Sequence, residues 1–284
     1  MNTGSMSPAP AASLPTFIRP GKRPLRAQLA ELWSHRELLH FLVWRDAKVR
    51  YKQTVLGAAW AVLQPFMTMV VFSVVFGRLA GVPSDGTPYP LFSFAALVPW
   101  TYFAAAVAGG ANSLVGNQLV ITRVYFPRLL IPAASVITPL IDFAIAFVMM
   151  LAMSLLWYRV VPSAAVLLLP AFVLLGAVTA FAAGVWFAAL NVEYRDVRYV
   201  LPFVVQFWMF ATPIAYPASL VPERWRPLYG LNPMATVVEG FRWTLLGTPP
   251  PSSMAPVSCL VLAALLVGGL SYFRRMEGTF ADVL

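Results

Sequence analysis

The residues that decide the fold are VVPSAAVLLLPAFVLLGAVTAFAAGVWFAALNV, residues 160–192, none of which is Asp, Glu, Lys or Arg. A helix needs about 20 consecutive, mainly apolar residues to cross a lipid bilayer. Similar uncharged stretches occupy residues 53–77, 86–122, 199–222 and 243–273, and residues 129–158 are interrupted only by Asp142. This repetition predicts an all-α polytopic membrane protein, because a helix satisfies its own backbone hydrogen bonds inside lipid.

The composition excludes the other broad classes of protein. Of the 284 residues, 60% are hydrophobic and 11% are charged, whereas a soluble domain carries about 25% charged residues. A disordered chain is excluded because it would be poor in apolar residues. The single Cys259 cannot build a disulfide framework or a cysteine zinc site, and His35 and His40 have no third ligand nearby, so we expect no metal site.

The net charge of +9 comes from basic residues whose positions indicate contact with a membrane surface rather than with nucleic acid. Nine of the 20 basic residues precede residue 53, and a basic flank beside apolar segments is typical of the cytoplasmic side of a membrane. Six predicted spans would put 15 of the 20 basic residues on the side of both termini, which are therefore expected in the cytoplasm. The predicted spans are about 54–76, 91–114, 132–157, 165–189, 198–215 and 253–273, within a transmembrane domain of residues 53–273 flanked by a flexible segment, 1–24, and a cytoplasmic tail, 274–284.

Residues 25–52 are predicted to form an interfacial amphipathic helix. At 100° per residue, most of its apolar side chains fall within one arc, which Arg36 and His40 interrupt. Such a helix rests in the headgroup layer. Two interpretations explain this pattern equally well. The helix is either a plain membrane anchor or one that also contacts a cytosolic partner or an anionic lipid. The candidate contact residues are Trp33, Arg36, Trp44, Arg45, Lys48, Arg50 and Lys52.

Two cytoplasmic loops carry candidate contact surfaces. In the loop 117–131, three apolar residues stand together between two arginines, which favours a docking surface over a belt of aromatics at the membrane interface. The turn at residues 191–200 alternates in charge, which fits a solvated face or a second contact with a partner. The candidates are Asn117, Gln118, Arg123, Val124, Tyr125, Phe126 and Arg128 in the first loop and Glu193, Arg195, Asp196 and Arg198 in the second.

The external segment 216–250 is predicted to contain a short helix. Asn232 can cap its N-terminus, Pro233 suits the first helical position and Gly247 suits its end. Apolar residues at helical spacing indicate a re-entrant gate helix at the mouth of a pore, and the alternative is a structured outer loop. The candidate gate residues are Asn232, Pro233, Glu239, Phe241 and Arg242, of which Glu239 and Arg242 are spaced to form an ion pair.

Asp142 is the only ionisable residue well inside a predicted span. A charge there is costly and is by default a functional hypothesis, although a single carboxylate makes a poor proton relay. We expect it to cap a helix or to bond to Ser135, Thr138 or a partner subunit.

Aromatic side chains in the spans have two possible uses. Most aromatics in a membrane protein pack or form interface belts, but aromatic rings also stack on the apolar faces of sugars. The candidates for a glycan channel are Trp60, Phe66, Phe72, Tyr102, Phe203, Phe207 and Phe210.

The sequence shows no means of catalysis, so we do not expect an enzyme. It contains no G-x-x-x-x-G-K-[ST] to hold nucleotide phosphates, and no G-x-S-x-G or H-E-x-x-H. Uphill transport would therefore need a separate subunit or an ion gradient. Two alternatives stay open, a gradient-driven secondary transporter that depends on Asp142 and a membrane glycosyl- or acyltransferase that uses Glu193 and Asp196.

Five stretches in order resemble the membrane subunit of polysaccharide-export ABC transporters, which include O-antigen, capsule and teichoic-acid exporters. They are RDAKVRYKQTVLGAAWAVLQP (45–65), YFPRLLIP (125–132), NVEYRDVRYVLP (191–202), LNPMATVVEGFRWTLLG (231–247) and FRRMEGTFADVL (273–284). The resemblance covers about residues 25–284.

The resemblance implies a homodimer of six-span subunits in the inner membrane with two cytosolic ATPase subunits. ATP and Mg would be bound by those partners, and this chain would bind no cofactor. A coupling helix within residues 117–128 would sit in a cleft of the ATPase, and segment 216–250 would form external gate helices. The substrate would be a lipid-linked polysaccharide moved between the two subunits, with O-antigen favoured over capsular polysaccharide and teichoic acid.

Overall fold

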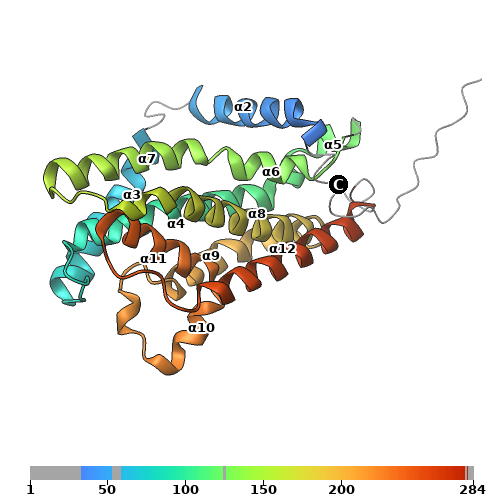
Figure 1. Cartoon of the computed structure of the whole chain (residues 1–284). Helices are drawn as coiled ribbons and strands as arrows, with labels where there is room; N and C mark the ends of the chain where they lie inside the picture. The colour runs from blue at the N-terminus through green and yellow to red at the C-terminus, as the bar shows by residue number, and fades with distance from the viewer. Residues whose placement is uncertain (1–32, 53–58, 124–125, 279, 281–284) are drawn as a thin grey trace, which may run out of the picture.

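The computed structural model describes residues 33–52, 59–123, 126–278 and residue 280. This part of the chain consists of helices joined by turns and loops, without a strand (Figure 1), which confirms the all-α prediction for it. The predicted flexible segment 1–24 and the beginning of the predicted interfacial helix, residues 25–32, lie outside the described residues.

The helices follow one another along the chain, and several of them join end to end. In order they are α2 (Arg36–Lys52), α3 (Ala59–Phe72) with the π-helical η1 (Ser73–Leu79), α4 (Tyr89–Gly116), α5 (Gln118–Arg123), α6 (Leu130–Ile137), α7 (Leu140–Ala152) with η2 (Met153–Trp157), η3 (Ala164–Leu168) with α8 (Leu169–Glu193), α9 (Val197–Ala211), η4 (Ala218–Leu220), η5 (Glu223–Trp225), α10 (Arg226–Gly230), α11 (Pro233–Leu246) and α12 (Ala255–Glu277).

Five of the described helices are long and apolar enough to cross a membrane. They are Ala59–Leu79, Tyr89–Gly116, Leu130–Trp157, Ala164–Glu193 and Ala255–Glu277. The sixth predicted span, residues 198–215, corresponds to α9, which has 15 residues and is shorter than the roughly 20 that a spanning helix needs. The structure therefore confirms a polytopic helical fold with five candidate spans and leaves the sixth as a prediction.

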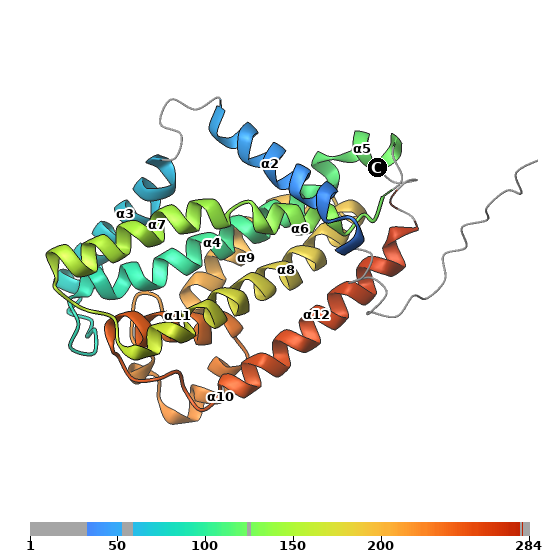
Figure 2. The same ribbon diagram turned by 45° about the horizontal axis from the view of Figure 1, so that its top comes forward.

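The long helices lie side by side, so the bundle has two ends (Figures 1 and 2). At one end α4, α8 and α12 finish near the short helix α5, and this is called the α5 end. At the opposite end α8 and α12 begin, next to the segment that contains α10 and α11, and this is called the α11 end. The predicted cytoplasmic loops lie at the α5 end and the predicted external segment lies at the α11 end.

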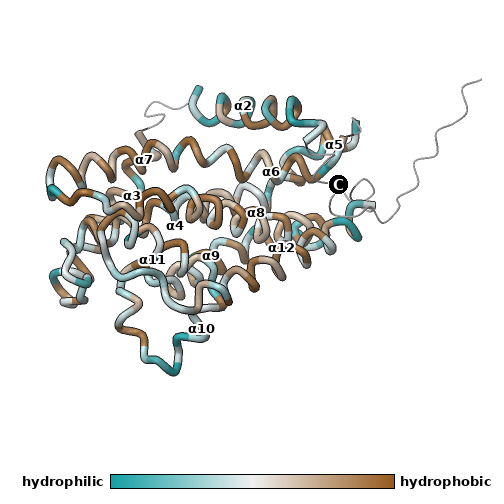
Figure 3. Tube along the Cα trace, viewed as in Figure 1, coloured by the Kyte–Doolittle hydropathy of each residue, from teal (hydrophilic) through white to brown (hydrophobic). Residues whose placement is uncertain are grey.

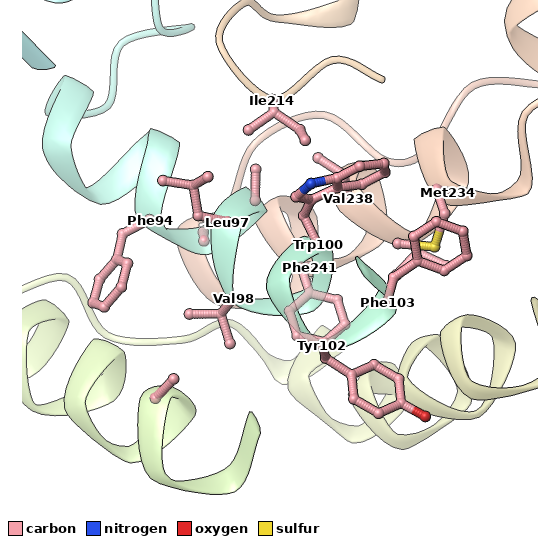
Figure 4. Packing of buried hydrophobic residues seen from close by; sticks show 14 of the residues in the cluster. Phe94, Leu97, Val98, Trp100, Tyr102, Phe103, Ile214, Met234, Val238 and Phe241 are labelled. Carbon is pink, nitrogen blue, oxygen red and sulfur yellow. The ribbon is translucent and has the colours of Figure 1, made fainter. Parts of the chain in front are cut away.

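Helix α4 forms the centre of the bundle. In its most apolar stretch of 18 residues, 78% of the residues are buried, against 17–28% in the corresponding stretches of the other four candidate spans. This fits the rule that a helix apolar on all sides belongs in a core. Phe103 of α4 packs edge-on against Trp208 of α9 with 4.8 Å between ring centroids. Figure 4 shows Phe94, Phe103 and Phe241 among the side chains that form this core. The other candidate spans are largely apolar along their length (Figure 3), and their low burial leaves apolar residues exposed, as a lipid environment requires.

Helices α4 and α8 approach each other most closely at two glycines. A Cβ atom placed on Gly110 would lie 3.0 Å from the Cα atom of Gly184. Small residues allow such contacts in membrane bundles, where close van der Waals packing takes the place of the hydrophobic effect between helices.

We expect Gly110→Ala to destabilise the protein although alanine is the better helix former by about 1 kcal/mol. The added methyl group would press on the backbone of α8, which cannot move aside as a flexible side chain can. Gly116→Ala is the matched control, because a Cβ atom there meets nothing within 4 Å. The check is the temperature at which each detergent-solubilised variant loses its monodisperse elution peak. A midpoint that falls for Gly110→Ala and holds for Gly116→Ala is the expected result, and equal midpoints would contradict the packing argument.

Candidate functional site

At the α5 end, Asn117 connects three helices. It is the residue at which α4 ends, and its side-chain amide donates to the carbonyl of Ser113 over 2.8 Å. Its carbonyl accepts the first backbone bonds of α5, from Val120 and Ile121. The guanidinium of Arg45 in α2 donates to the side-chain oxygen of Asn117 over 2.8 Å. Asn117 therefore links α5 to both α2 and α4.

The exposed face of α5 differs from the docking surface predicted from the sequence. Gln118, Leu119, Thr122 and Arg123 are exposed, whereas Ile121 is buried. Leu119 is 65% exposed and lies one helical turn from Arg123. The sequence analysis missed Leu119 and Thr122, although their spacing on one side of a short helix could have indicated them.

Phe126 is not part of an exposed cluster, which corrects the prediction. It is 8% exposed and packs in the cluster that contains Ile121, Leu130 and Phe273. Its ring packs with residues from the start of α6 and from the last part of α12. Val124 and Tyr125, the other two residues of the predicted docking cluster, lie outside the described residues.

Arg128 ties the same loop to the C-terminal part of the chain. Its guanidinium donates to the backbone carbonyl of Glu277 and lies 6.0 Å from the ring centroid of Phe280. Phe280 is fully buried and stacks edge-on against Phe273 of α12. The tail thus helps to hold the loop in place, a contact that the spacing of the residues could not predict.

The second predicted contact, in the turn between α8 and α9, is exposed throughout. Glu193, Arg195, Asp196 and Arg198 all face outward. The carboxylate of Glu193 accepts a hydrogen bond of 2.5 Å from the hydroxyl of Tyr272 in α12. A hydrogen bond from Tyr194 to Glu193, together with the charge of this carboxylate, raises the pKa of Tyr194. The exposure fits both interpretations of this turn, a solvated face or a contact with a partner.

Helix α2 presents apolar side chains on two faces. Leu42 and Ala47 are buried against the bundle, and α2 runs along α6 in both views (Figures 1 and 2). Trp33 and Trp44, assigned to the same apolar arc, are 72% and 56% exposed. They carry Arg36 and Lys48 over their rings at 5.9 and 5.1 Å, which is the geometry of a cation–π contact.

Asp142 binds groups that the sequence analysis did not consider. Its carboxylate accepts hydrogen bonds from the guanidinium of Arg50 and the hydroxyl of Tyr51, both in the last turn of α2. The hydroxyl of Thr138, an expected partner, donates instead to the carbonyl of Ala134 over 2.9 Å. Burial and the bond to Asp142 raise the pKa of Tyr51, so the phenol stays protonated and remains a donor.

At the α11 end, the predicted helix is present with the predicted ends. The side chain of Asn232 caps α11 by accepting from the backbone N–H of Met234 over 3.1 Å, Pro233 occupies the first turn, and Gly247 closes the helix with φ 70°. Asn232 also receives a bond from the indole of Trp208 over 2.9 Å. Almost all of α11 is buried among α4, α8 and α12.

Arg242 is buried in this packing and makes no use of its predicted partner. It is 3% exposed, and its guanidinium donates to the carbonyls of Phe92, Pro213 and Ile214 over 3.2, 2.6 and 2.7 Å. Glu239 instead accepts from the backbone N–H of Ser252 over 2.9 Å. The hydrogen bonds of both side chains therefore go to backbone groups, in place of the predicted ion pair.

The predicted channel aromatics separate into two groups. Phe72 and Tyr102 are 8% and 5% exposed, and Tyr102 donates to the carbonyl of Val136 over 3.2 Å, so both belong to the core of this chain. Phe66 is half-buried and packs against Phe94. The exposed members are Trp60, Phe203, Phe207 and Phe210. Phe203 and Phe207 also line a shallow apolar hollow with Val204, Trp208 and Ala211.

Comparison with known proteins gives matches along almost the whole chain. The ABC-2 type transporter family matches residues 37–246, from α2 to the end of α11. The O-antigen export system permease protein RfbA of Myxococcus xanthus is 32% identical over 89% of this chain and 97% of its own length. RfbA of Klebsiella pneumoniae is 25% identical over 87% and 95%, and the polysialic acid transport protein KpsM of Escherichia coli is 23% identical over 83% and 92%.

Proposed function

Because the chain belongs to the ABC-2 type transporter family, we propose that it is the permease subunit of an ATP-driven exporter that moves a lipid-linked polysaccharide across the inner membrane. It is a multi-pass membrane protein with five candidate spans. The observation that carries the proposal is the match of this chain to polysaccharide transport proteins over nearly their full length. The two relatives named for O-antigen export favour O-antigen as the substrate over a capsular polysaccharide or teichoic acid.

The proposal includes a sixth span, formed by residues 197–215. Val197 begins α9 at the α5 end, directly after the turn that follows α8. The hydroxyl of Tyr89, at the opposite end of α4, donates to the carbonyl of Ala215 over 2.6 Å. The segment between residues 197 and 215 therefore passes from one end of the bundle to the other, with four residues beyond α9 supplying the missing length. Six spans put both termini on one side, which the excess of basic residues assigns to the cytoplasm.

In the proposed assembly, the α5 end faces two cytosolic ATPase subunits that bind ATP and Mg²⁺. The exposed face of α5 is the contact surface, and the turn at Glu193–Arg198 and the helix α2 flank it. Two copies of this chain form the transport path, and the exposed Phe203, Phe207 and Trp60 are available to line it. Movement of the ATPases would reach the spans as displacement of helices at the α5 end, a rigid-body transition.

The decisive experiment separates ATP-driven export from gradient-driven transport. Tagged chain is purified in detergent from its own cells and the preparation is tested for a co-purifying subunit that is labelled by a photoreactive ATP analogue. Cells depleted of the chain are then expected to accumulate lipid-linked glycan on the cytoplasmic face. Transport that persists without ATP and stops when the proton gradient is collapsed would contradict the proposal and support a secondary transporter.

A further inference from the structure

The third candidate span, Leu130–Trp157, consists of two helices rather than one. α6 ends at Ile137 and α7 begins at Leu140, with Thr138 and Pro139 between them. Proline has no N–H group and its ring crowds the carbonyl four residues earlier, so it interrupts a helix at this point. The two halves of the span can therefore change their mutual angle at the break.

Asp142 lies in the first turn of α7, directly beyond the break. A carboxylate is favoured there because the N-terminus of a helix carries partial positive charge. From Leu130 to Asp142 the chain rises about 18 Å at about 1.5 Å per residue, which places Asp142 near the middle of the span. An ionised carboxylate at such a depth is costly unless it is paired, and Arg50 and Tyr51 of α2 supply the partners.

Helix α2 contacts both halves of the broken span and the start of α5. Its middle packs on α6 through the buried Leu42 and Ala47. Its Arg45 bonds to Asn117, where α4 passes into α5. Its last turn bonds to the first turn of α7 through Asp142. Of these three contacts, the last lies beyond the break, so it links the α7 half of the span to α2.

We propose that Asp142 is a positioning residue whose bonds to Arg50 and Tyr51 make α2 a bridge across the break in the third span. The proposal rests on the proposed function, because the bridge has a use when a partner moves α5. A displacement of α5 then passes through Asn117 and Arg45 to α2, and through Asp142 to the half of the span that lies toward the α11 end. Loss of the pair would remove this link between α7 and α2.

A cross-linking experiment tests the geometry independently of transport. In full-length chain carrying Cys259→Ser, Arg50→Cys and Asp142→Cys are combined and the membranes are treated with a short bifunctional thiol reagent. The two peptides are expected to be linked within one chain. The control combines Lys48→Cys with Asp142→Cys, since Lys48 lies over the ring of Trp44 instead. Equal linking in both pairs, or none in the first, would overturn the placement of α2.

A charge exchange tests the role in transport. Asp142→Asn and Arg50→Gln should each lower export per ATP hydrolysed by about tenfold, the size of an ordinary coupling effect between sites, while the ATPase still co-purifies. Asp142→Glu should keep most of the export, and Arg50→Asp combined with Asp142→Arg should exceed either of its single variants. Arg78→Gln, which changes an exposed arginine at the opposite end of the molecule, is the control.

The possible results separate the two proposals. If wild-type chain binds no ATPase, the proposed function fails and the cross-linking result alone decides the position of α2. If the ATPase binds and Asp142→Asn exports as the wild type does, the bridge is wrong. If Asp142→Asn does not accumulate in membranes, accumulation of the charge-exchanged double variant supports the bridge, and failure of that variant to accumulate overturns it.

Discussion

Replacement of Arg242 by methionine is expected to lower the stability of the protein more than any other single change of a charged residue considered. The methionine side chain fills much of the same space but donates no hydrogen bond. The carbonyls of Phe92, Pro213 and Ile214 would lose the guanidinium that binds them. A buried polar group left without a partner costs about 1–3 kcal/mol, so several such groups outweigh the relief of no longer burying a charge.

The loss should appear as a lower midpoint of thermal unfolding in detergent. A few kcal/mol corresponds to a fall of roughly 10 °C in a protein of this size. Arg224→Met is the matched control, because Arg224 belongs to the same external segment but lies exposed, 5.7 Å from the ring of Trp225. Equal midpoints for the two variants would show that Arg242 does not hold the end of α9 against α4 and α11.

Arg242 also illustrates what the sequence could and could not predict. The five candidate spans were predictable because the cost of placing charge in lipid acts on each residue separately. The ends of α11 were predictable because Asn232, Pro233 and Gly247 act on their own neighbours in the chain. The partners of Arg242 are backbone carbonyls 28, 29 and 150 residues away. Every residue carries a backbone carbonyl, so the sequence does not identify which ones Arg242 will bind.

The same limit explains two further differences, at Phe126 and at Asp142. Phe126 was expected to be exposed because it stands between arginines, but its burial depends on α6 and on the tail folding over it. Asp142 was expected to cap a helix or to bond to Ser135, Thr138 or a partner subunit, whereas Arg50 and Tyr51 reach it from 92 and 91 residues away. Hydropathy gives the burial of a segment, and only the tertiary arrangement gives the partner of a particular polar group.

The variant Leu119→Asp combined with Arg123→Glu is expected to abolish binding of the ATPase. Both side chains are exposed on α5, one helical turn apart, so the change replaces an apolar and a positive contact by two negative charges. Loss of one central interface residue often costs 2 kcal/mol or more, about a thirtyfold change in affinity. Phe126→Ala would be a poorer test, because removal of a buried ring disturbs the packing of the loop as well as any contact.

The opposite end of the molecule offers a control of the same chemistry. Leu220 and Arg224 repeat the spacing of Leu119 and Arg123, and both are exposed in the segment at the α11 end. Leu220→Asp combined with Arg224→Glu therefore makes an identical change in charge on the side away from the proposed ATPase. Membrane levels should be equal for both double variants, and co-purification of the ATPase should be lost only with the α5 variant. If both double variants retain the ATPase, the exposed face of α5 is not the surface that the ATPase binds.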